Sequence, residues 1–414
     1  MMMLTRHGGT TAPDRKICDD PLASHVGGFA AQLSLMGYAP NTVHSKCDVL
    51  ADLSRWLKRR HIPLAKLNEM RLSQFHEARR LRNRGRRGDR ATGRQLLAYL
   101  RSRGDVAPAA QQIDRTASAG IIRAYEAFLY NERGLSRSTA ARYLIIIRRF
   151  LDERFGCKVP HLDRLRPQDL HDFILREIRR VSRSHGKLIV TALRSFLRFL
   201  LQRGAIQTDL ACTLPGVPCW RLSHLPKSLP PDQVERLLDC CNRSTPAGER
   251  DYAILLLLAR LGLRGGEVLA MTLDDLDWER GEIVIRGKGQ RLERLPMPSD
   301  VGAALASYLC DVRPACATRR VFIRMKAPYQ GLAGPVAICS LVRRALGRAG
   351  LAPEFKGAHL FRHSLATDLL RRGATLGEIG QLLRHRQPIT TQIYAKVDIT
   401  ALRDIALPWP GGAS

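Results

Sequence analysis

The sequence predicts a mainly α-helical protein with one small antiparallel β-sheet, an α+β arrangement. Apolar residues recur at helical spacing through most of the chain, as at Phe29, Leu33 and Met36, which follow one another at i, i+4 and i+7. Strand-like alternation is found in one short region. Residues 281–298, GEIVIRGKGQRLERLPMP, predict two strands around a tight Gly-Lys-Gly turn, and VFIRM at 321–325 predicts a third strand.

The charge of the chain indicates a polyanionic partner. At 414 residues it is long enough for two or three domains, and a hydrophobic content of 45% is sufficient for real cores. However, 67 Lys and Arg face 38 Asp and Glu, which gives a formal net charge of +29 and a pI near 10.6. Such an excess in a folded chain points most often to nucleic acid. A ribosome-like scaffold would explain the sign of the charge, but not the ordered motifs described below.

Cysteine usage and hydropathy predict a cytoplasmic location. The ten cysteines include no CxxC pair, so neither a zinc site nor a disulfide framework is apparent, and reduced thiols are expected. The N-terminal segment MMMLTRHGGTTAPDRK has no apolar leader region. The longest apolar run, from Ala253, is interrupted by Arg260 and is typical of a core helix rather than a membrane span.

One helical pattern occurs twice in the N-terminal half. Residues 37–60 and 134–155 both begin with a glycine and a turn before an apolar stripe, and Thr42 corresponds to Thr139, 97 residues later. We interpret the two segments as a duplicated helical module. The alternative is two unrelated amphipathic helices that start in a similar way.

Composition suggests where the domains begin and end. Residues 79–94, RRLRNRGRRGDRATGR, are typical of a solvated loop, although the net charge makes phosphate contact at least as good an interpretation. Five prolines between Thr213 and Pro231 indicate an interdomain linker. The predicted parts are a tail at 1–23, a helical module at 24–110, a second module at 118–212, the linker at 213–230, a C-terminal domain at 231–403 and a tail at 404–414.

The C-terminal part carries an ordered set of basic side chains that ends in one hydroxyl. The six residues, found in the contexts LGLRGGE, RGKGQ, HLFRH, LLRH and TTQIY, are Arg264, Lys288, His359, Arg362, His385 and Tyr394. Attack on a phosphodiester requires such cations, because negative charge must be stabilised while an alkoxide is displaced. A phenol, with a pKa of about 10, also needs nearby positive charge to react as a phenolate.

Several of these residues have a simpler interpretation when taken alone. Arg264 followed by Glu267 is typical of a surface i,i+3 ion pair. Lys288 could be a solvated turn lysine, and Tyr394 a half-buried core tyrosine. The order of all six is what favours a single phosphate-binding site.

The segment HLFRH gives three further expectations. His359 and Arg362 lie three residues apart and therefore share one helix face, where a guanidinium fork can bind phosphate oxygens and an imidazole can move a proton. His363 is predicted to point elsewhere and to make a buried hydrogen bond. A metal site at the histidines is disfavoured, because carboxylate or thiolate companions are missing at ligand spacing.

Together the patterns LGLRxxE, GKGxxxxRxP, HxxRH and LLxHxxxxTTxxY resemble the phage-integrase family of tyrosine recombinases, over roughly residues 118–403. The family's arginine, lysine, histidine, arginine, histidine and tyrosine fall on the six residues named above, without departure. The resemblance implies a SAM-like core-binding domain at 118–212 and a catalytic domain at 231–403. The module at 24–110 would be an additional copy, with an arm-type or accessory DNA-binding role.

The resemblance also implies a mechanism. Tyr394 would attack a scissile phosphate to give a 3′-phosphotyrosine and a free 5′-hydroxyl, while the two arginines and His385 hold the non-bridging oxygens. Lys288 would protonate the leaving 5′-oxygen, and His359 would assist proton transfer near the tyrosine. Neither a metal nor ATP nor another cofactor is implied, and no GxxxxGK[ST] loop is present.

The same resemblance predicts the partners. They are double-stranded DNA and further copies of the chain, in a homotetramer that acts on two DNA sites in the bacterial cytoplasm, with related recombinases as an alternative to identical copies. The long N-terminal half favours the integration or movement of a mobile genetic element over a housekeeping function.

Three other functions fit parts of the sequence. A DNA-binding protein of the same fold that has lost catalysis is opposed by the complete set of six residues. A metal-dependent transposase or nuclease would use carboxylates such as Asp274, Asp275 and Asp277, yet LDDLDW is more typical of a helix end that leads into a strand. A type IB topoisomerase shares the phosphotyrosine chemistry but lacks sequence-specific synapsis. We favour the recombinase.

Overall fold

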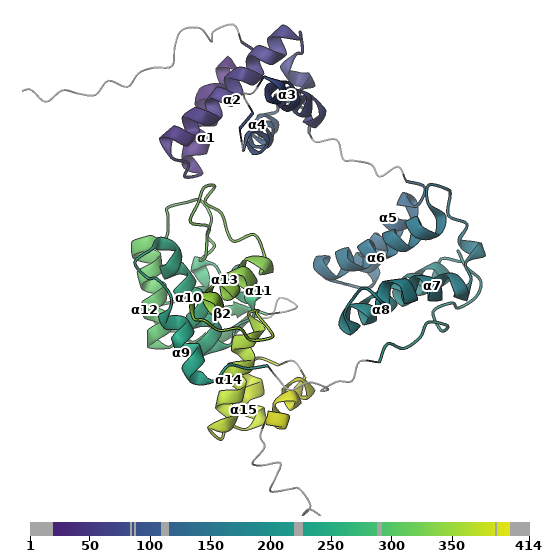
Figure 1. Ribbon diagram of the computed structural model, residues 1–414, viewed down its shortest axis with the longest axis vertical. Coiled ribbons are helices and arrows are strands. Elements are labelled where there is room, and N and C mark those ends of the chain that lie inside the picture. The colour runs from purple at the N-terminus through teal and green to yellow at the C-terminus, as the bar shows by residue number, and fades with distance from the viewer. Residues whose placement is uncertain are drawn as a thin grey trace, which may run out of the picture. The chain divides into compact units, whose positions relative to one another are not determined.

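The structure, a computed structural model, describes residues 20–82, 85–86, 88–108, 116–218, 227–287, 292–385 and 387–397 (Figure 1). Helices account for most of these residues, and one small sheet accompanies them, so the predicted fold class is confirmed. No helix among the described residues is long and apolar enough to cross a membrane. The three parts of the chain are described separately.

The first part packs its helices around one apolar core. The elements are η1 Ala23–His25, α1 Val26–Leu35, α2 Pro40–Arg59, η2 Leu64–Lys66, α3 Glu69–Leu81 and α4 Asp89–Arg103. Pro40 lies in the first turn of α2, and the side chain of Asn68 accepts a hydrogen bond of 3.0 Å from the backbone N–H of Arg71 at the start of α3. Leu57 and Leu100 are completely buried between these helices.

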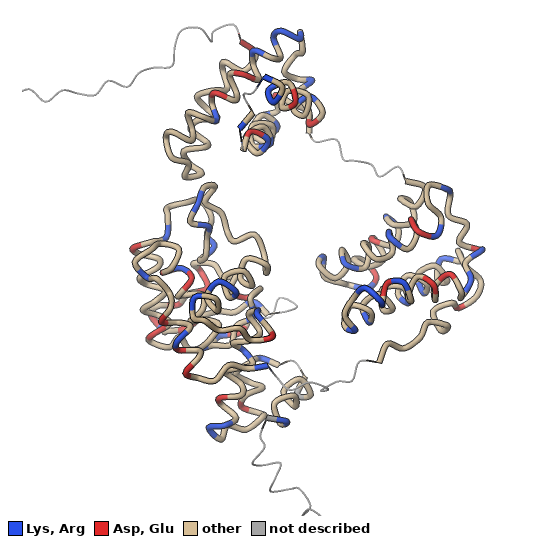
Figure 2. Tube along the Cα trace, viewed as in Figure 1, with Lys and Arg blue, Asp and Glu red and all other residues tan. Residues whose placement is uncertain are grey.

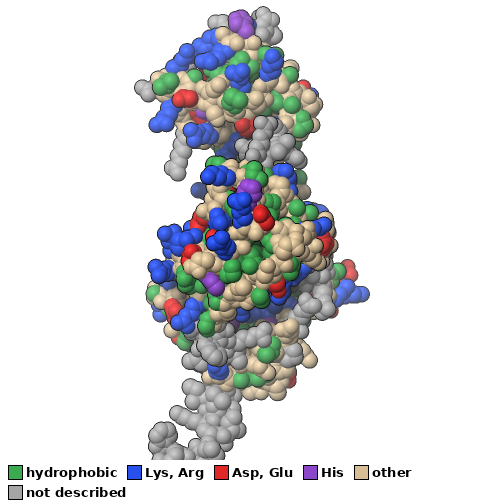
Figure 3. Space-filling view, turned by 90° about the vertical axis from the view of Figure 1, so that its right-hand side faces the viewer, with side chains coloured by type: hydrophobic (Ala, Val, Ile, Leu, Met, Phe, Trp, Pro, Cys, Tyr) green, Lys and Arg blue, Asp and Glu red, His purple; other side chains and the backbone are tan. Residues whose placement is uncertain are grey.

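The arginine-rich run between α3 and α4 is divided between the interior and the surface. Arg79 is buried, and its guanidinium pairs with Asp52 on α2 and, at 2.9 Å, with Asp89 on α4. Arg90 and Arg94 are exposed on α4 and have no carboxylate partner among the described residues. Arg79 therefore holds the helices together, whereas the other two are free for contact with an anion. Lys and Arg side chains gather over this part of the molecule (Figure 3).

The second part also has four α-helices among its described residues, with a 3-10 turn between the second and the third. It consists of α5 Ala119–Ala127, the π-helical turn η3 Phe128–Glu132, α6 Arg137–Phe155, η4 Leu162–Arg164, α7 Pro167–Ile178 and α8 Arg183–Gln202. In both parts a glycine with positive φ, Gly37 (83°) or Gly134 (57°), precedes the long helix, and a three-residue 3-10 turn follows it. This agreement supports the predicted duplication. Rings of Tyr125 and Phe196, whose centroids are 5.0 Å apart, lie in the core of the second part.

The C-terminal part is built around one apolar helix, α10. Its elements are α9 Pro231–Asp239, α10 Pro246–Leu261, α11 Gly265–Ala270, η5 Leu273–Asp275, β1 Leu276–Asp277, β2 Glu282–Arg286, β3 Leu292–Pro296, α12 Ser299–Ser307, η6 Tyr308–Val312, α13 Pro335–Arg348, α14 His359–Arg371, α15 Leu376–Leu382 and η7 Pro388–Val397. Leu255, Leu257 and Leu258 on α10 are completely buried. Helices α9, α12 and α14 pack against α10, so the run from Ala253 is a core helix as predicted.

The sheet is antiparallel, in the order β1-β2-β3, and Ile283 of β2 lies opposite both Leu276 and Leu295. The two strands around the Gly-Lys-Gly turn are confirmed, but the prediction of a strand at 321–325 is wrong. That segment is apolar because it is buried: the Phe322 ring stacks on Tyr308, with centroids 5.5 Å apart. The third strand is instead β1, which lies within the LDDLDW segment directly after the 3-10 turn η5.

Gly262 ends α10 in a conformation that other residues adopt at a cost. Its φ is +56°, and a Cβ there would lie 2.8 Å from a methyl group of Leu383. Gly262→Ala should therefore lower the free energy of unfolding by about 1–3 kcal/mol. Gly266→Ala is the matched control, since this helical glycine has open space around it and alanine should stabilise the helix by roughly 0.5–1 kcal/mol. Denaturant unfolding measures both; equal stability of the two variants would contradict the argument.

Candidate active site

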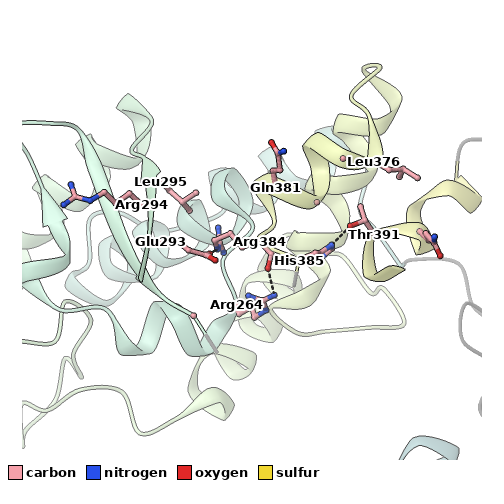
Figure 4. Close-up of a pocket in the computed structure, with 13 residues that line it drawn as sticks. Arg264, Glu293, Arg294, Leu295, Leu376, Gln381, Arg384, His385 and Thr391 are labelled. Atoms are coloured by element: carbon pink, nitrogen blue, oxygen red, sulfur yellow. Dashed lines mark hydrogen bonds and ion pairs between the residues drawn. The ribbon is translucent and has the colours of Figure 1, made fainter. Parts of the chain in front are cut away.

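A cavity of ≈ 880 Å³ lies between the start of α11, the β2–β3 hairpin and the turn from α15 to η7 (Figure 4). Among the side chains and glycines that line it are Arg264, Gly287, Glu293, Arg384, His385 and Thr391. Arg264 also borders an adjoining cavity of ≈ 430 Å³, which His359 lines from the start of α14. Two of the predicted site residues thus face the first cavity, and a third lies beside it.

Arg264 is held by a buried carboxylate one turn along α11. Its Nη1 donates to Oε1 of Glu267 at 2.6 Å, and its backbone N–H donates to Oε2 of the same carboxylate at 2.9 Å. The Glu267 side chain is only 6% exposed, so the pair is not the surface ion pair that this segment alone would suggest. The guanidinium of Arg264 keeps one face toward the cavity.

Arg362 is a buried cation whose partners are carbonyl groups. Its Nη1 donates to the carbonyl oxygen of Gly262 at 2.7 Å, and its Nη2 donates to that of Leu383. It makes no ion pair with a carboxylate among the described residues. Burial, together with the charges of Arg264 and Arg384, lowers the pKa of Arg362 to about 10, so it remains charged at neutral pH. Because burying an unpaired charge is costly, the site is suited to an incoming anion.

The imidazoles near these arginines are neutral at pH 7. Burial is the largest cause, and the charge of Arg362 adds to it. The pKa of His359 is lowered, and that of His385 falls to about 4. These side chains therefore donate or accept hydrogen bonds in the free protein and contribute no positive charge.

His385 is oriented by a buried threonine. Its Nδ1 lies 2.7 Å from Oγ1 of Thr391, which is 2% exposed (Figure 4). A hydroxyl that donates to Nδ1 leaves the ring proton on Nε2, where the imidazole can act as a donor. Thr391 was not among the site residues predicted from the sequence. The sequence marks it only as the second threonine of the TTxxY pattern.

Tyr394 is buried and hydrogen-bonded to a histidine that was predicted to lie elsewhere. Its hydroxyl is 3.0 Å from Nδ1 of His363, and its ring is parallel to that of His385, with centroids 6.4 Å apart. His363 does make a buried hydrogen bond, but the expectation that it points away from the site is wrong. The reason is that η7 packs against α14 and brings the phenol to this side of the helix.

The environment of Tyr394 disfavours ionisation in the free protein. The residue is 1% exposed, and burial raises the pKa of its phenol to about 12, although the nearby Arg362 opposes the shift. Within the described residues no hydrogen bond joins His359 to Tyr394. In this state His363 is the direct partner of the hydroxyl.

Lys288 lies outside the described residues. Of the described residues on either side of it in the sequence, Gly287 and Glu293 both line the ≈ 880 Å³ cavity.

The carboxylates of the metal-dependent alternative are engaged elsewhere. Asp275 accepts hydrogen bonds from the backbone and hydroxyl of Thr272, both at 2.8 Å, and from Arg286 at 2.7 Å. Asp274 pairs with Arg319. These contacts end a helical turn and brace β2, and no group of three metal-ligating side chains is present among the described residues.

Comparison with known proteins assigns the family. The model of the phage integrase family matches residues 227–400, and that of the phage integrase N-terminal SAM-like domain matches residues 122–204. A putative integrase/recombinase, y4rA of Sinorhizobium fredii, is 45% identical over 400 residues, which are 95% of this chain and 96% of that one. The tyrosine recombinase XerD of Listeria monocytogenes is 32% identical over 286 residues, 67% of this chain and 94% of XerD.

Solved structures share the fold. The XerH recombinase bound to its difH substrate after cleavage aligns with a TM-score of 0.55 and 20% identity, over 70% of this chain and 83% of that one. The Tn1549 transposon integrase bound to circular intermediate DNA aligns with a TM-score of 0.53 and 16% identity, over 69% and 99%.

The chain therefore belongs to the phage integrase family of tyrosine recombinases. It is an enzyme of site-specific DNA recombination, and its partner is DNA.

Removing the hydroxyl of Thr391 should slow DNA cleavage without weakening DNA binding. In Thr391→Val the Nδ1 atom of His385 loses its partner, and a hydrogen bond with a net value of about 1–1.5 kcal/mol corresponds to roughly a tenfold lower rate. Thr390→Val is the control, because the neighbouring side chain is exposed. Single-turnover cleavage of a bound duplex measures the effect, and equal rates for both variants would refute the orienting role.

Proposed function

We propose that Tyr394 is the nucleophile that cuts DNA, and that it forms a 3′-phosphotyrosine and releases a 5′-hydroxyl. The observation that carries the proposal is the buried Arg362, whose guanidinium has carbonyl partners but no carboxylate among the described residues, with Arg264 and the Tyr394 phenol nearby. A phosphate bound by the two arginines would supply the missing anion. The same cations would stabilise the charge that develops on phosphorus and on the phenolate.

The remaining site residues would bind the non-bridging phosphate oxygens or transfer protons. His385, with its Nδ1 bound by Thr391, would donate to a non-bridging oxygen. Lys288 would protonate the leaving 5′-oxygen, and His359 would assist proton transfer near the tyrosine, as the family resemblance implies. The phosphotyrosine keeps the energy of the phosphodiester, so religation needs neither ATP nor a metal.

The N-terminal parts would hold the DNA. We propose that residues 118–212 form the core-binding domain, that 213–230 link it to the catalytic domain at 231–403, and that 24–110 form an accessory DNA-binding module. Lys and Arg occur throughout all three described parts, which supports contact with DNA along the chain (Figure 2). Residues 20–108 contain seventeen Lys and Arg but only seven Asp and Glu. The accessory role rests on this excess and on the repeated order of helices.

The proposal also includes an oligomeric assembly and a biological role. We propose a homotetramer that exchanges strands between two DNA sites and serves the integration or movement of a mobile element. Relatives named integrase/recombinase and a structural neighbour from a transposon support this role.

The first test is capture of the covalent intermediate. On a nicked duplex that loses the 5′-hydroxyl fragment after cleavage, the protein should accumulate a covalent protein–DNA product, in EDTA as well as in Mg²⁺. Tyr394→Phe should bind the same duplex but give no product, because it lacks the attacking oxygen. Peptide mapping identifies the linked residue. A product linked to another residue, or cleavage that requires Mg²⁺, would overturn the proposal.

The second test concerns the accessory module. Arg90→Gln combined with Arg94→Gln should weaken DNA binding, and each lost phosphate contact should reduce the slope of log K against log salt concentration by about 0.9. Arg101→Gln is the matched control on the same helix, since this arginine is already paired with Glu69 at 2.7 Å. Binding is measured across a salt titration of the full chain. An unchanged slope in the double variant would rule out these contacts.

A further inference from the structure

Arg384 occupies a backbone position that arginine rarely adopts. Its φ is +55°, and His61 is the other non-glycine residue with positive φ within the described part of the chain. Arg384 follows the end of α15, where its N–H donates to the carbonyl of Gln381 at 2.9 Å and the next N–H, of His385, donates to Gly380 at 2.9 Å. Glycine is the usual residue at such a left-handed helix end. The contacts of the arginine side chain must therefore offset the strain of its backbone.

Those contacts are two carboxylates. The Arg384 side chain is only 5% exposed, and its Nη2 lies 2.9 Å from Oε2 of Glu267. Its Nε lies 3.5 Å from Oε2 of Glu293, which is beside it in Figure 4. Glu267 is also the carboxylate that holds Arg264, through Oε1 at 2.6 Å. The carbonyl of Arg384 in turn accepts from Nη2 of Arg264 at 3.5 Å. Arg264 is thus held between the carboxylate that Arg384 binds and the backbone of Arg384 itself.

Arg384 connects elements that come from distant parts of the sequence. Glu267 belongs to α11, Glu293 lies on β3, and His385 is the residue that follows Arg384. One rigid planar guanidinium can bind both carboxylates at once, which the single ammonium of a lysine does less well.

The charge of Arg384 has a second effect. Without it, Glu267 would neutralise Arg264 and present a negative charge toward an incoming phosphate. With it, the cluster keeps a positive balance, because Glu267 is shared between two guanidinium groups and Arg362 lies close by. The same residue therefore fixes the geometry of Arg264 and preserves its attraction for an anion.

We propose that Arg384 is a positioning residue for DNA cleavage, which acts by holding Glu267 and Glu293 so that Arg264 and the β2–β3 hairpin keep one arrangement around the scissile phosphate. This inference rests on the proposed function of Arg264 as a phosphate-binding residue. It extends that function to a side chain outside the six residues of the family motif.

The experiment compares Arg384→Gly and Arg384→Lys with wild type in single-turnover cleavage of the nicked duplex at saturating protein. Glycine tolerates the positive φ, so the backbone of the first variant is unstrained. We expect its cleavage rate to fall about 10- to 100-fold, because misplaced catalytic groups are costly, with the Kd for DNA changed by less than about threefold. Lysine keeps the charge but binds the two carboxylates less well, so an intermediate rate is expected.

Arg260→Ala is the matched control. Arg260 also bridges two carboxylates, Glu235 at 2.5 Å and Asp300 at 2.8 Å, but it lies outside the cavity, so its loss should leave the cleavage rate within about twofold of wild type. If Arg384→Gly does not fold, Glu293→Gln decides, since this side chain is 42% exposed and its change breaks only the link to β3. A normal cleavage rate in Glu293→Gln would then overturn the proposal.

Two further readouts separate positioning from a structural role. Burial would raise the pKa of Glu267, but Arg264 and Arg384 help to hold it below its usual value. The other titratable or charged groups of this cluster are Glu293, His359 and Arg362. Loss of Arg384 should raise that pKa and move the acid limb of the cleavage rate to higher pH. In an Arg264→Ala background, Arg384→Gly should slow the remaining rate by a smaller factor than in the wild type, because only the link through Glu293 to β3 is then left to lose.

The outcomes distinguish the two proposals. A wild-type protein that forms no covalent product overturns the function proposed above. A wild type that cleaves, together with an Arg384→Gly variant of equal rate and equal pH profile, overturns the role of Arg384 alone. That role is also overturned if Arg384→Gly slows cleavage equally in the wild-type and Arg264→Ala backgrounds.

Discussion

A buried guanidinium held by two carbonyl groups is the interaction on which the C-terminal part depends. Arg362 binds the carbonyls of Gly262 and Leu383, which lie at the ends of α10 and α15. Because a buried charge is tolerated only when its donors are satisfied, these two helix ends must stay where the guanidinium can reach both. The chain continues from them directly into Arg264 and toward His385. The contact that stabilises the fold thus also brings together the groups that would bind a phosphate.

Local patterns were sufficient to predict most of the fold. The helical spacing of apolar residues, the Gly-Lys-Gly hairpin and the repeat around residues 37–60 and 134–155 all correspond to elements of the structure. The strand predicted at 321–325 failed because an apolar run shows only that a segment is buried, and not what covers it. Here the covering group is Tyr308, an aromatic ring rather than a neighbouring strand. Such a contact depends on tertiary packing that no short window contains.

The candidate site could be predicted as a set of residues but not as a network. The order of the motifs singled out Arg264, Arg362, His385 and Tyr394, and the structure brings these four into one region. The sequence could not show that Glu267 is buried or that Arg384 shares its carboxylate, because the ion pair joins residues 117 positions apart. The same limit applies to His363, 31 positions from the tyrosine whose hydroxyl it contacts. In each case the residue type gives no signal until a second segment lies against it.

The neutral histidines have a consequence for how the protein responds to its surroundings. The pKa values of His363 and His385 are about 4 and that of Arg362 is about 10, so between these limits none of the three exchanges a proton with the medium in the empty site. Electrostatic attraction from these groups is therefore constant across the acidity range of living cells. An anion beside an imidazole raises its affinity for a proton. Because His385 lines the cavity, the proton affinity of this imidazole would respond to an anion bound there rather than to the acidity of the medium, and loading with nucleic acid would itself prepare it for acid–base chemistry.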